Sequence, residues 1–148
     1  MNKWIIAAGL LAFSIPSPAE AQTSTPQRPK VSTAQRALGP PPRGFKKVSS
    51  LVNFPNFSPG LGILYVRPET LPTGPFLAYD RRGQRVSTIY MIPVEDMQNR
   101  KNFDLAGFAG RNDHVDVYFN SGHPGVEMPH YHVVIWHVNK RGEARVAK

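Results

Sequence analysis

Short β-prone runs separated by turns rich in proline and glycine account for most of the chain from Phe45 onward. The runs 47–52 and 62–67 flank the turn cluster at 54–60, and the segment 76–92 consists of two apolar runs around a glycine-containing loop. Runs of this length, bounded by turn residues, are typical of strands, and two of them around a short glycine loop indicate a hairpin. We therefore predict strands at 47–52 and 62–67 and a β-hairpin over 76–92.

Two further strands are predicted near the C-terminus, because polar and apolar residues alternate over 113–119 and again over 129–138. Between the hairpin and these strands, the segment 94–100 carries acidic residues early and a basic residue late, which suits the dipole of one short helix. The predicted fold is mainly β: an antiparallel sheet, or a small barrel or sandwich, with one short helix.

The 148 residues fit one domain with leading segments. Residues 1–21 combine a basic start, an apolar run and a small-residue pattern ending at Ala21, which indicates a signal peptide. The apolar run is too short for a transmembrane segment, which needs about 20 residues. Residues 22–43 are rich in Pro, Ser, Thr and Gln and predict a flexible, disordered linker, so the β domain is assigned to 44–148. We expect the protein to be secreted or periplasmic.

Charge and cysteine content limit the function classes. The chain has 18 Lys and Arg against 10 Asp and Glu, a net charge of +8, but the basic residues are dispersed and form no recognition motif. We therefore expect weak contact with anionic envelope components and no nucleic-acid binding. The absence of cysteine removes disulfides, thiol nucleophiles and finger-type zinc sites, which leaves His, Asp, Glu and Met as candidate metal ligands.

All five histidines lie between positions 114 and 137. Alternation places His130 and His132 on one face of a strand, and antiparallel pairing of the two C-terminal strands would bring His114 and Asp116 across from them. His123, Glu127 and Met128 lie on the connecting loop, where they would either close the shell or face solvent, and the sequence leaves both outcomes open. Imidazole is the commonest protein metal ligand. The predicted metal ligands are His114, Asp116, His123, His130 and His132.

Zinc or copper is the expected divalent transition metal, with copper(I) favoured if Met128 faces the histidines. Two interpretations stay open, because histidines on strands also serve structural or pH-sensitive roles. A carboxylate, Asp116 or Glu127, beside a metal-bound water would allow hydrolysis, but no nucleophile or phosphate-binding motif stands out. We therefore assign no catalytic residue and favour a non-enzymatic role. The alternative function is a metal-free structural or oligomeric envelope protein.

The C-terminal histidine motifs resemble a family of small exported bacterial proteins of unknown function, typified by a Thermus TTHB-type domain. That family has an Asp-His-Val-type strand, a Gly-His-Pro turn and a Pro-His-Phe-Asp strand with a second histidine four positions after its first. The residues matching by position are His114, His123 and His130, whereas His132 replaces the Asp and Val134 the later His. The resemblance covers about 62–138 and implies a mostly β domain that self-associates as a homo-oligomer.

A weaker similarity connects the pair His130 and His132 with cupin metal sites, which place a Glu a few residues later and a further His on a later strand. Here the next acid is Glu143, beyond a predicted turn at 139–142, and little chain remains for another histidine. A cupin-like metal enzyme is therefore placed below the non-catalytic interpretations.

Overall fold

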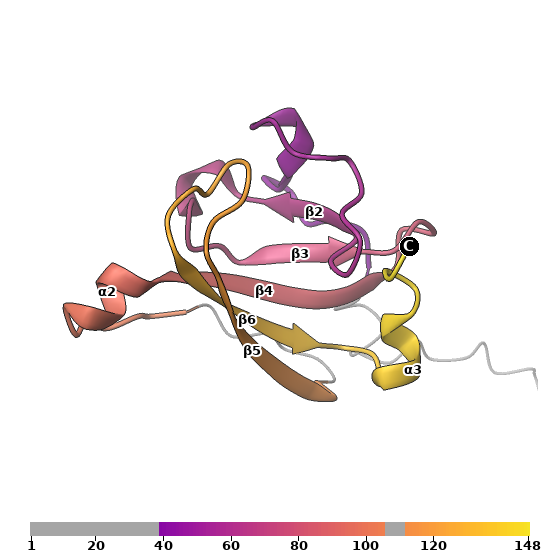
Figure 1. Cartoon of the computed structure of the whole chain (residues 1–148). Coiled ribbons are helices and arrows are strands. Elements are labelled where there is room, and N and C mark those ends of the chain that lie inside the picture. The colour runs from indigo at the N-terminus through magenta and orange to yellow at the C-terminus, as the bar shows by residue number, and fades with distance from the viewer. Residues whose placement is uncertain (1–38, 106–111) are drawn as a thin grey trace, which may run out of the picture. The chain divides into compact units, whose positions relative to one another are not determined.

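A single antiparallel sheet with the strand order β1-β2-β3-β4-β6-β5 forms the frame of the domain (Figure 1). The computed structural model describes residues 39–105 and 112–148. The predicted signal peptide at 1–21 and the linker as far as position 38 lie outside the described residues. Within the part that is described, no helix has the length and apolar character needed to span a bilayer.

The strands follow the predicted order along the chain. They are β1 (Lys46–Lys47), β2 (Ile63–Val66), β3 (Phe76–Tyr79), β4 (Arg85–Pro93), β5 (His114–Asn120) and β6 (His130–Trp136). The α-helices of the described segments are α2 (Val94–Gln98) and α3 (Lys140–Glu143). The prediction of an antiparallel, mainly β fold is confirmed. The sheet is open and forms neither a barrel nor a sandwich. The structure has a short helix, α3, in addition to the predicted helix.

The strand predicted at 47–52 is wrong beyond its first residue. β1 ends at Lys47, and a 3-10 helix, η1 (Val48–Ser50), follows it. The hydroxyl of Ser50 donates to the carbonyl of Lys47 at 2.7 Å, and the amide of Leu51 donates to the carbonyl of Val48 at 2.9 Å. A serine side chain that bonds the local backbone in this way competes with strand pairing, which the apolar pattern alone could not show.

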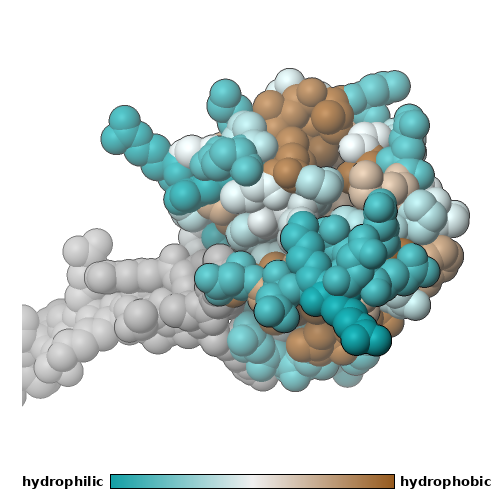
Figure 2. Space-filling view, turned by 90° about the vertical axis from the view of Figure 1, so that its left-hand side faces the viewer, coloured by the Kyte–Doolittle hydropathy of each residue, from teal (hydrophilic) through white to brown (hydrophobic). Residues whose placement is uncertain are grey.

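The helix predicted after Pro93 is confirmed as α2, at the end of β4. Glu95 and Asp96 lie in its first turn, where they suit the positive end of the helix dipole, and Lys101 pairs with Asp96 at 2.9 Å beyond its last turn. Figure 2 looks at the end of the sheet that carries α2, and hydrophilic surface fills its foreground.

The hydrophobic core lies on one face of the sheet. The register places Ile89 opposite Phe76 and Val134, so these side chains from three neighbouring strands point the same way. Burial removes apolar surface from water and is the main favourable contribution to folding. Phe76 and Tyr79 are each 1% exposed, so both aromatic side chains of β3 are buried. The core face continues along β6 to His132 and His130.

The chain just before β1 is tied to the sheet. The hydroxyl of Tyr79 donates to the carbonyl of Gly39 at 3.0 Å, so the last part of the segment predicted as linker contacts β3. At the same end of β3, the guanidinium of Arg145 binds the carboxylate of the next residue, Asp80, in the β3–β4 turn, with Nε to Oδ2 at 2.7 Å. Both contacts join parts of the chain that are far apart in sequence.

Candidate metal centre

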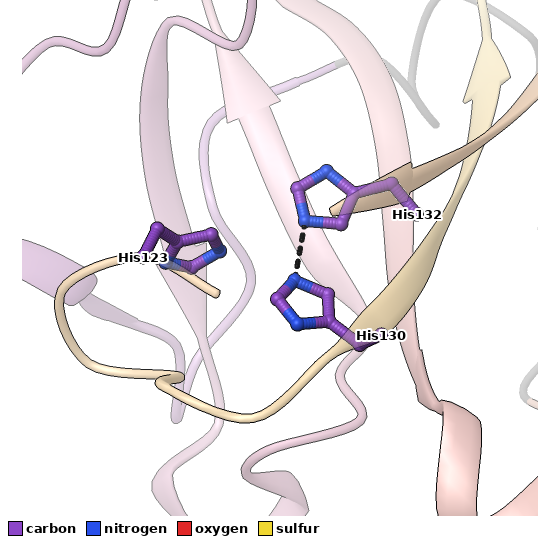
Figure 3. Close-up of side chains that lie close together, drawn as sticks. All are labelled: His123, His130 and His132. Carbon is purple, nitrogen blue, oxygen red and sulfur yellow. Dashed lines mark hydrogen bonds between the residues drawn. The ribbon is translucent and has the colours of Figure 1, made fainter. Parts of the chain in front are cut away.

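Three histidines converge at the end of the core face (Figure 3). The Nε2 atoms of His130 and His132 are 2.9 Å apart, and the ring of His123 lies 5.0 Å and 5.6 Å, centroid to centroid, from those of His130 and His132. One nitrogen of each ring lies within 4.8 Å of the others. We call these residues the histidine trio.

Strand β6 fixes two members of the trio. His130 and His132 are two residues apart and therefore point to the same face, where the register sets them opposite Pro93 and Met91 of β4. Both are buried, with 0% and 1% of their surface exposed. A buried polar side chain is costly unless it is hydrogen-bonded or bound to a metal, so their placement requires partners.

A tight turn brings His123 over this pair. In His123-Pro124-Gly125-Val126 the amide of Val126 donates to the carbonyl of His123 at 2.9 Å, and Gly125 has a φ of 89°. Proline followed by a residue with positive φ is the signature of a type II turn, in which glycine avoids the strain of a side chain. Val126 is 9% exposed and packs in the core, which anchors the loop on the sheet.

The outer nitrogens of two rings in the trio contact backbone carbonyls. Nδ1 of His130 lies 2.7 Å from the carbonyl of Met128, and Nδ1 of His123 lies 3.1 Å from the carbonyl of Pro124. A carbonyl can only accept, so each Nδ1 carries the hydrogen and the Nε2 of the neutral ring keeps its lone pair. This is the arrangement found in metal sites, where the distal N–H of a ligating histidine is held by an oxygen acceptor.

The third ring is held by a side chain. Nδ1 of His132 lies 2.8 Å from the hydroxyl of Tyr118 on β5, and the two rings are 4.9 Å apart. Burial, together with the neighbouring His130 and His123, lowers the pKa of His132 to about 4. Burial also raises the pKa of Tyr118, so its phenol stays protonated. At neutral pH, His132 is therefore a neutral imidazole.

His123 contributes an unusual atom. Its Nε2 is buried, and no hydrogen-bond partner for it exists among residues 39–105 and 112–148. The edge of the His123 ring also meets Phe54 at 6.0 Å between centroids, so the ring is packed in place. A buried nitrogen lone pair aimed at two other histidines can accept a hydrogen bond or bind a cation.

A second cluster lies at the other end of β5. Nε2 of His114 is 2.7 Å from Oε1 of Glu143 on α3, and 3.9 Å from Oδ2 of Asp116. Lys140 lies 3.3 Å from Asp116 and 3.2 Å from Glu143. Bonds from the indole of Trp136 and the ammonium of Lys140 hold the pKa of Asp116 below its ordinary value. The carboxylates of this cluster therefore already have a cation beside them.

The sequence prediction that His114 and Asp116 stand across from the histidines of β6 is wrong. The register pairs His114 with Trp136 and Asp116 with Val134, so the five predicted ligands fall into two clusters. The positions opposite His132 and His130 are taken by Tyr118 and Asn120.

Sequence reasoning did not identify Tyr118 and Glu143 as site residues. Alternation along β5 puts Tyr118 on the same face as the predicted ligands His114 and Asp116, and this pattern could have identified Tyr118. No sequence pattern connects Glu143 with His114. Met128 enters the site through its backbone carbonyl, and its side chain is 48% exposed. His137 lies outside both clusters, with Nε2 2.9 Å from the hydroxyl of Thr88.

Comparison with known proteins agrees with this fold. The profile of the TTHB210-like family, described as hypothetical protein TTHB210, matches residues 80–119. The crystal structure of hypothetical protein TTHB210 from Thermus thermophilus is similar, with a TM-score of 0.57 and 42% sequence identity over 63% of this chain and 92% of that one. No curated protein matches the chain. The identity and the near-complete coverage of the Thermus protein show that this chain belongs to the TTHB210-like family.

Proposed function

We propose that this protein binds a divalent transition metal, zinc or copper, through the Nε2 atoms of His123, His130 and His132, in a structural or sequestering role. One observation supports the proposal above all others. The Nε2 atoms converge, while each Nδ1 is engaged by an oxygen outside the trio's rings. In the metal-free protein Nε2 of His132 donates to Nε2 of His130, and a metal would displace this hydrogen, which His132 can carry instead on Nδ1 facing the Tyr118 hydroxyl. Three imidazoles oriented in this way then form a set of nitrogen ligands.

The distances fit a small cation after minor adjustment. Zinc–nitrogen bonds of about 2.0–2.1 Å in a tetrahedron separate the nitrogens by about 3.3 Å. The pair His130 and His132 is at 2.9 Å, and the donor atoms of the trio all lie within 4.8 Å of one another. Small ring rotations therefore suffice. A metal would also provide the buried Nε2 of His123 with a partner.

The ligand set favours zinc or copper(II) over copper(I). All three donors are imidazole nitrogens, which suit both divalent ions, whereas copper(I) prefers soft sulfur ligands. The exposed side chain of Met128 gives no support to a sulfur ligand. The cluster of His114, Asp116 and Glu143 is less suited, because Lys140 would have to be displaced.

Metal content measured by mass spectrometry tests the proposal. The full chain is prepared without a histidine tag and loaded with zinc or copper, and it is compared with the double variant His130→Ala, His132→Ala. The matched control is His114→Ala, which removes a histidine outside the trio. We expect near-stoichiometric metal in the wild type and the control, and loss of it in the double variant. Metal-free wild-type protein whose melting temperature neither ion raises would overturn the proposal.

The alternative is a metal-free structural or oligomeric protein, and one observation favours it. The edge strand β5 exposes Val115, Val117 and Phe119, on the face opposite the trio, with 53%, 62% and 54% of their surface accessible. An exposed apolar row on a sheet edge suits self-association. Light scattering would show an oligomer that Val117→Lys dissociates. A monomeric wild type would remove this alternative.

Export is a further proposal, supported by the basic start, apolar run and small-residue pattern of residues 1–21. The mass of the protein recovered from cells that express the whole chain tests it. Loss of the first 21 residues is expected, and a full-length product retained in the cytoplasm would contradict it.

A further inference from the structure

An open cleft of about 440 Å³ reaches the histidine trio from solvent. His123 and His132 both line it, so a ligand in the cleft lies beside two rings of the trio. Tyr118 and Asn120 of β5 form part of one wall. The remaining wall is the loop that leads from η1 into β2, with Phe54, Pro55, Ser58, Pro59, Gly60 and Leu61.

The trio provides three protein ligands. Across the described residues, the group that can hold a metal together with His123 contains only His130 and His132, while Asp116 and Glu143 lie in the second cluster. A tetrahedral ion with three protein ligands keeps its fourth position for an exogenous molecule, as catalytic and ligand-binding zinc sites do. The cleft would give that position a route to solvent once the rings turn toward a metal, because Nε2 of His123 is buried and His132 is 1% exposed in the metal-free protein.

The cleft lacks charge. None of the residues that line it is Asp, Glu, Lys or Arg. A divalent ion held by three neutral imidazoles would therefore retain its full double positive charge. Because an uncompensated charge beside apolar walls is poorly solvated, the fourth ligand is expected to be an anion.

We propose that the cleft binds a small monoanion with an apolar body, of the carboxylate class, whose anionic group takes the fourth position on the trio's metal. The inference rests on the proposed metal site and adds its ligand. The ring of Phe54 and the side chain of Leu61 give the apolar body a surface to contact. Tyr118 and Asn120, which also line the cleft, are its polar residues on β5.

Cobalt(II) gives a readout that separates the two proposals, because its visible absorption reports the ligands directly. The full, tag-free chain is loaded with Co²⁺ and titrated with acetate, benzoate and the neutral base imidazole. We expect a tetrahedral spectrum that both carboxylates shift, with benzoate binding about tenfold more tightly than acetate because its ring is buried on the apolar wall.

Each outcome decides a specific claim. A tetrahedral spectrum that none of the three compounds changes overturns the claim that the fourth coordination position is open to a ligand. The proposal of the metal site itself is then unaffected. A shift with imidazole alone overturns the assignment to an anion. Absence of bound cobalt, together with absence of zinc and copper in the metal-content measurement, overturns the metal site and the ligand together.

A pair of variants tests the apolar wall. Phe54→Leu shortens a side chain that lines the cleft, whereas Phe119→Leu makes the same change on the exposed face of β5, outside the cleft. We expect the preference for benzoate over acetate to shrink severalfold in Phe54→Leu and to stay unchanged in Phe119→Leu. The preference is a ratio of two affinities on one metal site, so it is independent of any effect that Phe54, which packs against His123, has on metal affinity. An equal preference in both variants would overturn the assignment of Phe54 to the ligand.

Discussion

The hydroxyl of Tyr118 lies 2.8 Å from Nδ1 of His132, its cross-strand partner. This contact joins the edge strand β5 to the trio through the nitrogen that faces away from the other histidines. An outer partner of this kind fixes the orientation and tautomer of a ligating ring. The pair is therefore the link between the sheet register and the candidate metal site.

Tyr118→Phe should weaken metal binding about tenfold, because loss of an outer hydrogen-bond partner usually costs about 10- to 100-fold in affinity. Competition with a chromophoric chelator measures the change. Tyr131→Phe is the matched control, since Tyr131 lies on β6 but points to the opposite face from His132. Equal affinities in the two variants would show that Tyr118 does not orient His132.

The alternation along β5 and β6 predicted which residues share a face, and this part of the site followed from the sequence. The register did not, because the length of the 121–129 loop left the cross-strand partners undetermined. In the structure β5 stays paired up to Asn120 opposite His130, which moves His114 and Asp116 away from the trio. A shift of the register by an even number of residues changes every cross-strand neighbour while leaving the faces unchanged.

The tertiary contacts of Glu143 and Val126 were also beyond sequence reasoning. Asn139 caps α3 by accepting from the amide of Gly142 at 3.0 Å, and that turn of helix carries Glu143 to His114. Val126 belongs to a loop, yet it is buried in the core. Both placements depend on packing between segments far apart in the chain, which local patterns do not encode.

The stability of the metal-free protein should fall as the pH drops from about 6.5 to about 4. The pKa of His132 is about 4 in the folded protein, whereas the pKa of a histidine in the unfolded chain is about 6.5. The unfolded state therefore binds the proton more tightly. The contribution of His132 is complete above about pH 6.5 and is lost toward pH 4, by up to about 1.4 kcal/mol per pH unit.

Urea unfolding at several pH values measures this dependence. His132→Gln cannot titrate in the same range, so its unfolding free energy should vary less with pH than that of the wild type. Parallel pH profiles for the two proteins would show that His132 is not the group responsible.

Gly125→Ala should destabilise the loop that carries His123. At its φ of 89° a side chain costs about 1–2 kcal/mol, and the added Cβ would lie 3.0 Å from Cγ2 of Val52. Gly83→Ala is a matched control, because Gly83 has a φ of 73° with nothing within 4 Å of its Cβ position. Thermal unfolding should show losses in both variants, whereas chelator competition should show weaker metal binding only in Gly125→Ala. Metal binding that is unchanged in Gly125→Ala would mean that the turn does not position His123.

Asp80→Asn should lower the free energy of unfolding by about 2 kcal/mol without changing metal binding. Asp80 is 3% exposed, and its carboxylate accepts from the amides of Arg82 and Gln84, each at 2.9 Å, and from the guanidinium of Arg145. Burial alone would raise the pKa of Asp80, but these bonds outweigh it and hold the pKa below the ordinary value.

The contribution of ionised Asp80 to the free energy of unfolding is therefore present above the pKa of an aspartate in the unfolded chain, about 3.9. It is lost as the pH falls through the lower pKa that Asp80 has in the folded protein. Urea unfolding at pH 7 measures the loss in Asp80→Asn. Asp104→Asn is the control, because it makes the same change at a position away from the β3–β4 turn. The difference between wild type and Asp80→Asn should shrink in acid, as wild-type Asp80 takes up its proton. A variant as stable as the wild type at pH 7 would show that the link between the β3–β4 turn and Arg145 contributes nothing to folding.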